Sequence, residues 1–208
     1  MLGRTALRLH SYVIARDYGF APNPFYGFCT LATCKPKIRK TADIGDWVVG
    51  TGSKARARGD HLVYAMHVSE AMTFQLYWDD RRFLQKRPYL RGSKKQGFGD
   101  NIYHRTGKKW RQEDSHHSLA DGSPNVRNID NDTQTDRILV SNDFVYFGGS
   151  GPAVPKKFRD YGGFDICTGR RGHTNSYPTK MVNEFVAWLR SLGDTGYCGE
   201  PLDWAKSP

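Results

Sequence analysis

The sequence predicts an α+β fold that is rich in β structure, a barrel of short strands with flanking helices and one C-terminal helix. Three observations support this prediction. Short β-branched and aromatic runs are separated by glycine-rich turns, a long amphipathic pattern lies near the C-terminus, and strands do not alternate regularly with helices. A parallel βαβ sheet requires strands and helices to alternate along the chain, so this fold is the weaker alternative.

The strands are predicted from apolar and β-branched runs that end at turn residues. In chain order they cover residues 7–15, 46–51, 61–69, 101–105, 137–141 and 144–148. The intervening segment 69–84, SEAMTFQLYWDDRRFL, groups its larger apolar residues on one side at helical spacing. We therefore expect this segment to be helical in part.

The C-terminal helix is predicted over residues 179–192. Pro178 precedes this segment and Gly193 follows it, as is typical of residues that start and stop a helix. The apolar residues that recur at helical spacing are Met181, Val182, Phe185, Val186, Leu189 and Leu192. We expect this apolar face to pack against the sheet.

A chain of 208 residues suits a single domain, and no repeat, long linker or clear boundary divides residues 1–208. The N-terminal segment lacks the apolar stretch of a signal peptide. No later run approaches the roughly 20 apolar residues that cross a bilayer. We therefore expect a cytoplasmic protein with no membrane partner, and we infer no protein partner.

The cysteines lie too far apart in sequence for a zinc knuckle, and the histidines lack the spacing of a metalloprotease helix. The cysteines are Cys29, Cys34, Cys167 and Cys198. We expect buried, reduced thiols, with no metal and no other cofactor. A zinc site stays an open alternative that no spacing supports.

The charge of the chain favours a polyanionic partner. Thirty-one Lys and Arg against twenty-one Asp and Glu give a formal net charge of +10, and 13% of the residues are aromatic. Residues 81–111 hold eleven of the basic residues and one acidic residue, Asp100. Cations supply phosphate contacts and the interleaved rings can stack on unpaired bases, so we expect DNA as the partner. The alternative is a solvated basic face whose rings turn inward.

The residues expected to contact a nucleic-acid backbone come from this segment and from a second basic turn, GSKARARG at 52–59. They are Lys54, Arg56, Arg58, Arg91, Lys94, Lys95, Arg105, Lys108 and Lys109.

The loop ARDYGFAPNPFYG at 15–27 is rich in rings and stiffened by two prolines, which indicates a slot with flat walls for an unstacked base. The predicted base-binding residues are Tyr18, Phe20, Phe25, Tyr26, Trp47 and Tyr103. Asp17 in this loop can stabilise positive charge that develops on a sugar. Its alternative role is to cap a turn or to pair with Arg16.

A second polar cluster, GDNIYHR at 99–105, lies within the basic segment. The predicted catalytic residues from both clusters are Asp17, Asp100, Asn23, Asn101 and His104. The two carboxylates are expected to act at the sugar, and the other groups to orient water or to protonate the departing base. The acidic segment NIDNDTQTDR at 128–137 is interpreted as a solvated turn, with a carboxylate that faces the site as the alternative.

Three stretches carry a resemblance to a known family: residues 12–53, GDNIYHR, and RILVSNDFVYFGG at 137–149. They resemble the nucleotide modification associated domain family, second type, over nearly the whole chain. IGDWVVGTGS with LVYAMHVSEAMTFQLYW is similar to the Gly-Asp turn and following strands of PUA-like barrels, which include the EVE and ASCH domains. These resemblances imply handling of modified nucleotides in phage or other foreign DNA, with a base held against aromatic walls.

We expect a DNA glycosylase that flips a bulky modified base out of foreign DNA and hydrolyses its N-glycosidic bond, in anti-phage defence. No lysine is singled out for Schiff-base chemistry, so the expected product is an abasic site in an uncut strand. A non-catalytic reader of modified bases in DNA or RNA is the first alternative, and it needs no carboxylate at the sugar. The second is an RNA-binding or interaction protein that uses only the basic segment.

Overall fold

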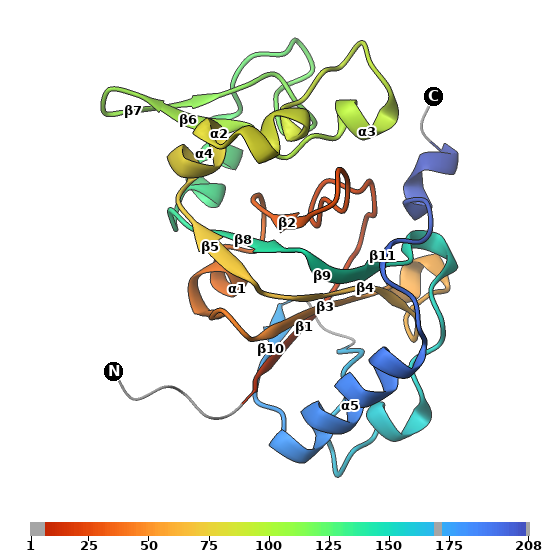
Figure 1. Cartoon of the computed structure of the whole chain (residues 1–208). Helices are drawn as coiled ribbons and strands as arrows, with labels where there is room; N and C mark the ends of the chain where they lie inside the picture. The colour runs from red at the N-terminus through yellow and green to blue at the C-terminus, as the bar shows by residue number, and fades with distance from the viewer. Residues whose placement is uncertain (1–6, 169–171, 207–208) are drawn as a thin grey trace, which may run out of the picture. The chain divides into compact units, whose positions relative to one another are not determined.

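A computed structural model describes residues 7–168 and 172–206 of the chain (Figure 1). The described chain divides into two compact units, and each unit combines stretches that are distant in sequence. Unit 1 lies within residues 1–17, 42–68 and 143–208, and unit 2 comprises residues 18–41 and 69–142. The single domain over residues 1–208 stays a prediction.

Unit 1 is built on a mixed sheet whose strands, in the described part of the chain, follow the order β10-β1-β3-β4-β9-β11. These strands are β1 (Leu9–Val13), β3 (Trp47–Thr51), β4 (Leu62–His67), β9 (Asp143–Tyr146), β10 (His173–Thr174) and β11 (Gly196–Tyr197). The central pairs β3–β4 and β4–β9 are antiparallel, whereas β1 with β3 and β9 with β11 run parallel. The four strands predicted in this unit are confirmed, with slightly different ends.

The predicted C-terminal helix is α5 (Thr179–Ser191), and it packs on the sheet of unit 1. Its buried residues Met181, Phe185 and Leu189 recur at helical spacing and share one apolar cluster with Trp47 and Val145. Short 3₁₀ helices lie in the connections of this unit: η1 (Lys54–Arg56), η3 (Gly148–Ser150), η4 (Lys156–Phe158) and η5 (Leu202–Lys206).

Unit 2 contains an antiparallel sheet in the order β2-β8-β5 and a separate hairpin of β6 with β7. Its strands are β2 (Cys29–Leu31), β5 (Glu70–Met72), β6 (Tyr103–Thr106), β7 (Lys109–Gln112) and β8 (Ile138–Ser141). Its helices are α1 (Pro36–Thr41), α2 (Phe74–Asp79), η2 (Arg81–Lys86), α3 (Lys94–Gly97) and α4 (Val126–Asp132). The strands predicted at 101–105 and 137–141 correspond to β6 and β8.

The segment 69–84 is helical in part, as predicted. It begins as β5 and turns helical after Thr73, whose side-chain oxygen accepts a hydrogen bond from the Leu76 backbone N–H at 3.2 Å. Threonine at this position caps a helix because it satisfies a backbone donor that has no partner within the helix. The large residues Phe74, Tyr77 and Phe83 are buried in a ring-rich core.

The α+β class and the C-terminal helix are confirmed, but the strands form open sheets and not the predicted closed barrel. In the described part of unit 1 the sheet ends at the short strands β10 and β11, which pair with β1 and β9 and not with each other. A search of the described residues finds no helix with the length and apolar character that a bilayer crossing requires.

Candidate functional site

An open groove with a volume of about 630 Å³ lies in unit 2. It is lined by one residue of α2, by the segment between η2 and α3, and by the residues that follow β7: Trp78, Arg87, Pro88, Tyr89, Leu90, Arg91, Glu113 and Asp114. This volume is within the range that small-molecule sites occupy, on the order of 300–1,000 Å³. The lining combines two rings, two cations and two carboxylates, which are the groups that bind a nucleotide's base, phosphate and sugar.

One wall of the groove is held in place by stacked side chains. The Trp78 ring stacks on the imidazole of His104, with ring centroids 4.2 Å apart, and the Arg87 guanidinium lies 3.7 Å from the Trp78 centroid. Tyr89, in contrast, is 56% exposed. Tyr89 therefore presents a ring on which a flat ligand can stack, whereas Trp78 fixes the shape of the wall.

His104 and Glu113 form an acid-base pair at the edge of this groove. The His104 Nε2 lies 2.8 Å from the Glu113 Oε1. The side chain of Glu113 is 44% exposed and that of His104 is 17% exposed, so the pair is open to solvent. A histidine beside a carboxylate can pass a proton to or from a bound group.

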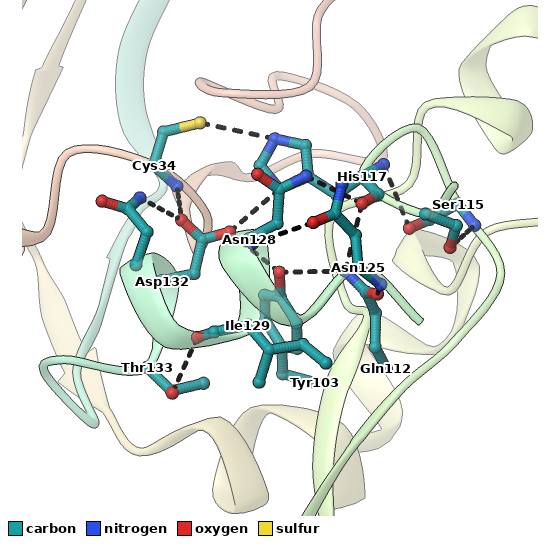
Figure 2. A network of polar contacts seen from close by, with 12 residues as sticks. Cys34, Tyr103, Gln112, Ser115, His117, Asn125, Asn128, Ile129, Asp132 and Thr133 are labelled. Carbon is teal, nitrogen blue, oxygen red and sulfur yellow. Dashed lines mark hydrogen bonds and ion pairs between the residues drawn. The ribbon is translucent and has the colours of Figure 1, made fainter. Parts of the chain in front are cut away.

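A second cluster in unit 2 is a polar network around Cys34, His117 and Asp132 (Figure 2). It includes Tyr103 and Gln112 of the β6–β7 hairpin. The Cys34 Sγ lies 3.6 Å from the His117 Nε2, and the His117 Nδ1 lies 2.9 Å from the Asp132 Oδ2. The Tyr103 hydroxyl donates to the same Asp132 oxygen at 3.0 Å. Gln112, which pairs with Tyr103 across the hairpin, donates to the Tyr103 hydroxyl at 3.2 Å.

The alternation of side chains along a strand explains why the β6–β7 hairpin contributes residues both to the Cys34 network and to the side of the groove. Successive side chains of a strand point to opposite faces. Tyr103 and Gln112 thus face the Cys34 network. His104, the next residue of β6, and Glu113, which directly follows β7, lie on the side of the groove, where Glu113 is a lining residue.

The environment of His117 favours its protonated form. Burial acts to lower the pKa of His117, but the hydrogen bonds to Asp132 and to Cys34 outweigh burial and raise that pKa to about 9. Imidazolium is therefore the dominant form at neutral pH.

This raised pKa predicts a pH-dependent stability. His117 contributes stability that is complete below its unfolded pKa of 6.5 and is lost as the pH rises through about 9. The contribution amounts to about 3 kcal/mol at most. We expect the free energy of unfolding of the wild type, measured with urea, to fall between pH 6 and pH 9.5 by this amount, and that of His117→Gln to lack this decrease. If the free energy of unfolding changes equally with pH in the two proteins, the prediction is wrong.

Cys34, His117 and Asp132 each offer one ligand atom, and these atoms lie within 4.8 Å of one another, a spacing that a metal ion requires. However, the carboxylate occupies Nδ1 of the imidazole and the sulfur occupies Nε2. An ion bound by the sulfur and Nε2 would therefore lack the carboxylate as a ligand. This order of groups fits a proton relay better than a three-ligand metal centre.

Asp17, the first predicted catalytic residue, is 5% exposed and belongs to unit 1. Its carboxylate accepts hydrogen bonds from the Tyr146 hydroxyl and, at 3.1 Å, from the Leu202 backbone N–H. The recess beside it measures about 10 Å³, which holds about one water molecule. The catalytic role of Asp17 stays a prediction, and the recess is too small for a base.

Asp100, Asn23 and Asn101 lie in unit 2 and are buried. Asp100 accepts hydrogen bonds from the hydroxyls of Thr30 and Tyr77, whereas Asn23 and Asn101 bond mainly to backbone groups. These contacts hold segments of unit 2 together. Of the predicted catalytic residues, none lines the groove, but His104 contacts two residues that do, Trp78 and Glu113.

The predicted base-binding rings are largely buried. Phe20, Phe25 and Tyr103 lie inside unit 2, and Trp47 lies in the core of unit 1. The half-buried residues of the set are Tyr18, which stacks on Phe98 with centroids 5.2 Å apart, and Tyr26. The structure therefore does not bring these rings together as walls of an open slot, and their role in base binding stays a prediction.

The predicted backbone-binding cations are exposed in unit 2 and partly paired in unit 1. The exposed residues of unit 2 are Arg91, Lys94, Lys95, Arg105, Lys108 and Lys109. In unit 1, Lys54 is exposed, whereas Arg56 pairs with Asp203 at 2.6 Å and Arg58 donates to the Gly151 carbonyl at 2.9 Å. The exposed cations of unit 2 thus lie on and just before α3 and on the β6–β7 hairpin, and their role in backbone binding stays a prediction.

Sequence reasoning missed Trp78, Glu113 and the Cys34 network. Cys34 and His117 are separated by 83 positions, and no local pattern links them. The interpretation of 128–137 as a solvated turn is wrong for residues 128–132, which belong to α4, and Asp132 at the end of this helix is fully buried. Asp130 and Asp136 are exposed, as a solvated segment requires. The signal that was available is the side-by-side pair His116 and His117 in a polar segment.

A family model described as nucleotide modification associated domain 2 matches residues 6–208, essentially the whole chain. No curated protein matches the chain, and no solved structure matches it.

Proposed function

Because the chain belongs to the nucleotide modification associated domain 2 family, we propose that it binds DNA with a modified base and hydrolyses that base's N-glycosidic bond. The description of this family is consistent with a role in which the protein acts on or binds modified nucleotides. The finer proposal is a glycosylase that acts on foreign DNA such as that of phages. The observation that carries it is the groove of unit 2, where an exposed ring, two arginines and the His104–Glu113 pair meet.

The groove suits one unstacked nucleotide. The base stacks on Tyr89, and Arg87 and Arg91 bind the flanking phosphates. The exposed cations on α3 and on the hairpin extend the contact along the DNA backbone. Taking one base out of the stack costs a few kcal/mol, which the stacking on Tyr89 and the phosphate contacts offset.

The His104–Glu113 pair supplies the chemistry that N-glycoside hydrolysis needs. The sugar passes through an oxocarbenium-like state, which a carboxylate stabilises. Glu113 can also take a proton from the attacking water, while protonated His104 gives one to the departing base. The products are the free base and an abasic site.

The test uses oligonucleotides that carry one modified base, with unmodified oligonucleotides of the same sequence as the reference. Affinity is measured by fluorescence anisotropy at several salt concentrations, and released base by mass spectrometry. We expect Glu113→Gln to abolish release and keep affinity, because the amide still accepts hydrogen bonds but takes no proton. Asp17→Asn is the comparison variant: if it abolishes release and Glu113→Gln does not, Asp17 is the catalytic carboxylate predicted from sequence.

Binding variants separate the groove from the basic surface. Tyr89→Ala is expected to weaken binding by about tenfold or more, the loss of one stacked base. Phe164→Ala removes an exposed ring of unit 1 and serves as the control. Lys94→Glu with Lys95→Glu is expected to lower affinity and flatten its salt dependence. If modified DNA is bound but recovered intact, the protein is a reader and the glycosylase proposal is wrong.

A further inference from the structure

The Cys34, His117 and Asp132 side chains stand in the linear order of a nucleophile, a base and an orienting acid. The sulfur faces the His117 Nε2 at 3.6 Å, and the carboxylate faces Nδ1 at 2.9 Å (Figure 2). A carboxylate on Nδ1 holds the imidazole in one orientation and directs its other nitrogen at the sulfur. The same arrangement activates the nucleophile in cysteine hydrolases.

Asp132 is held in place from several sides. Its Oδ1 accepts hydrogen bonds from the Cys34 backbone N–H at 2.8 Å and from Asn131 at 3.0 Å. Its Oδ2 accepts from the Tyr103 hydroxyl as well as facing His117. A fully buried carboxylate with this many donors is fixed in position, as an orienting acid must be.

The backbone at the nucleophile is strained. Cys34 has a φ of 55° and Lys35 a φ of 43°, so two successive residues with side chains adopt the left-handed conformation. This conformation costs such residues on the order of 1–3 kcal/mol each and concentrates at functional sites. Here the strain is held by the Cys34 N–H bond to Asp132 and by Arg39, whose Nε donates to the Cys34 carbonyl at 2.9 Å.

Cys34 is less buried than two of the other cysteines. Cys34 and His117 are half-buried, whereas Cys29 and Cys167 are fully buried. The site lies on the face of the β6–β7 hairpin opposite to the groove, so it is separate from the nucleotide site proposed above. Nothing in the proposed glycosylase step uses it.

We propose that Cys34, His117 and Asp132 form a catalytic relay in which the Cys34 sulfur accepts an acyl group from an ester or amide. Acyl transfer is the reaction class that the geometry favours, because one proton must move from the nucleophile to the leaving group. The Nε2 of His117 lies where it can carry that proton. A thiol with only a structural role needs neither the His117 Nε2 beside it nor the Asp132 carboxylate that orients this imidazole.

The step balances as follows for an ester or an amide. The thiolate attacks the carbonyl carbon, the carbon–sulfur bond forms and the carbonyl π electrons move to oxygen. When the carbonyl re-forms, the bond to the leaving oxygen or nitrogen breaks and that atom takes the His117 proton. Water then attacks the thioester as His117 accepts its proton, and the products are a carboxylic acid and the restored thiol.

Several charged groups act on this thiol and imidazole. Lys35 and Arg39 interact electrostatically with Cys34 from its own loop and from α1, and Tyr103 does so from β6. The His116 ring stacks on that of His117 with centroids 6.2 Å apart.

The first experiment compares the alkylation of Cys34 with that of the exposed Cys198 by iodoacetamide, using peptide mass spectrometry from pH 5 to 9. We expect Cys34 to react about tenfold faster than Cys198 at pH 6, because the His117 Nε2 lies 3.6 Å from the Cys34 sulfur and can hold the thiol proton. In His117→Gln the rate at Cys34 should fall to about that of Cys198, while the rate at Cys198 is unchanged.

The second experiment uses p-nitrophenyl acetate with the full-length protein. We expect a burst of about one equivalent of nitrophenol and an acetyl group on Cys34 by intact mass. Cys34→Ser and His117→Gln should abolish the burst, and Cys198→Ser should keep it. Equal pH profiles for Cys34 and Cys198 would overturn the relay, and alkylation without acetylation would overturn the acyl-transfer assignment. Both results are independent of base release from DNA, so the glycosylase proposal can fail without affecting this one.

Discussion

Asp100→Ala is expected to lower the free energy of unfolding by about 3–5 kcal/mol, the typical loss when a buried charge loses its partner. Asp100 is 1% exposed. Its two oxygens accept from the Thr30 hydroxyl at 2.7 Å and from the Tyr77 hydroxyl at 2.8 Å. Both donors would be left inside the core without this acceptor.

Lys86 makes the same variant more costly. This lysine is fully buried, and its Nζ donates at 3.0 Å to the backbone carbonyls of Asn23 and Phe28. Burial lowers the pKa of Lys86 to about 8, against the opposing effect of the nearby Asp100 charge. Burial likewise raises the pKa of Asp100. Removing the carboxylate thus leaves the lysine charge with less compensation.

A double variant tests this explanation. Lys86→Met with Asp100→Leu replaces both charges with apolar groups of similar size, and we expect it to recover much of the lost stability. Urea denaturation at pH 7 measures both variants. If Asp100→Ala unfolds like the wild type but no longer releases modified base from DNA, Asp100 is the catalytic carboxylate predicted from sequence.

Arg39→Met is expected to destabilise the protein by about 3 kcal/mol, because it removes several buried hydrogen bonds at once. The Arg39 side chain is fully buried on α1. It donates to four backbone carbonyls, those of Cys34, Asp132, Thr135 and Arg137. Arg39 therefore ties the loop of Cys34 to the end of α4 and to the start of β8.

The same variant should also slow the reaction of Cys34 with iodoacetamide, since Arg39 holds the strained Cys34 backbone. Lys40→Met is the matched control, because Lys40 is the exposed neighbour on α1. Its effect on the free energy of unfolding should stay within about 0.5 kcal/mol. Unchanged stability in Arg39→Met, measured by urea denaturation, would show that water replaces the guanidinium at these carbonyls.

The exposure of the basic residues could be expected from composition, whereas their role in binding a nucleic-acid backbone stays a prediction. The lysines and arginines of α3 and the hairpin are exposed because a basic loop with few apolar residues has little to bury. The same reasoning failed for the rings. Phe20, Phe25 and Tyr103 are large apolar groups that unit 2 uses for its core, and burial of that area outweighs any role at the surface.

The sequence alone determined the α+β class, the position of the C-terminal helix, most strands and the location of the basic surface. Each of these follows from residues that are neighbours along the chain, through helical or strand periodicity or local charge. The tertiary structure decided that the sheets stay open, that Asp100 pairs with buried partners, and that Cys34 meets His117 across 83 positions. Such contacts depend on how distant segments pack around a shared core, and no local pattern records that packing.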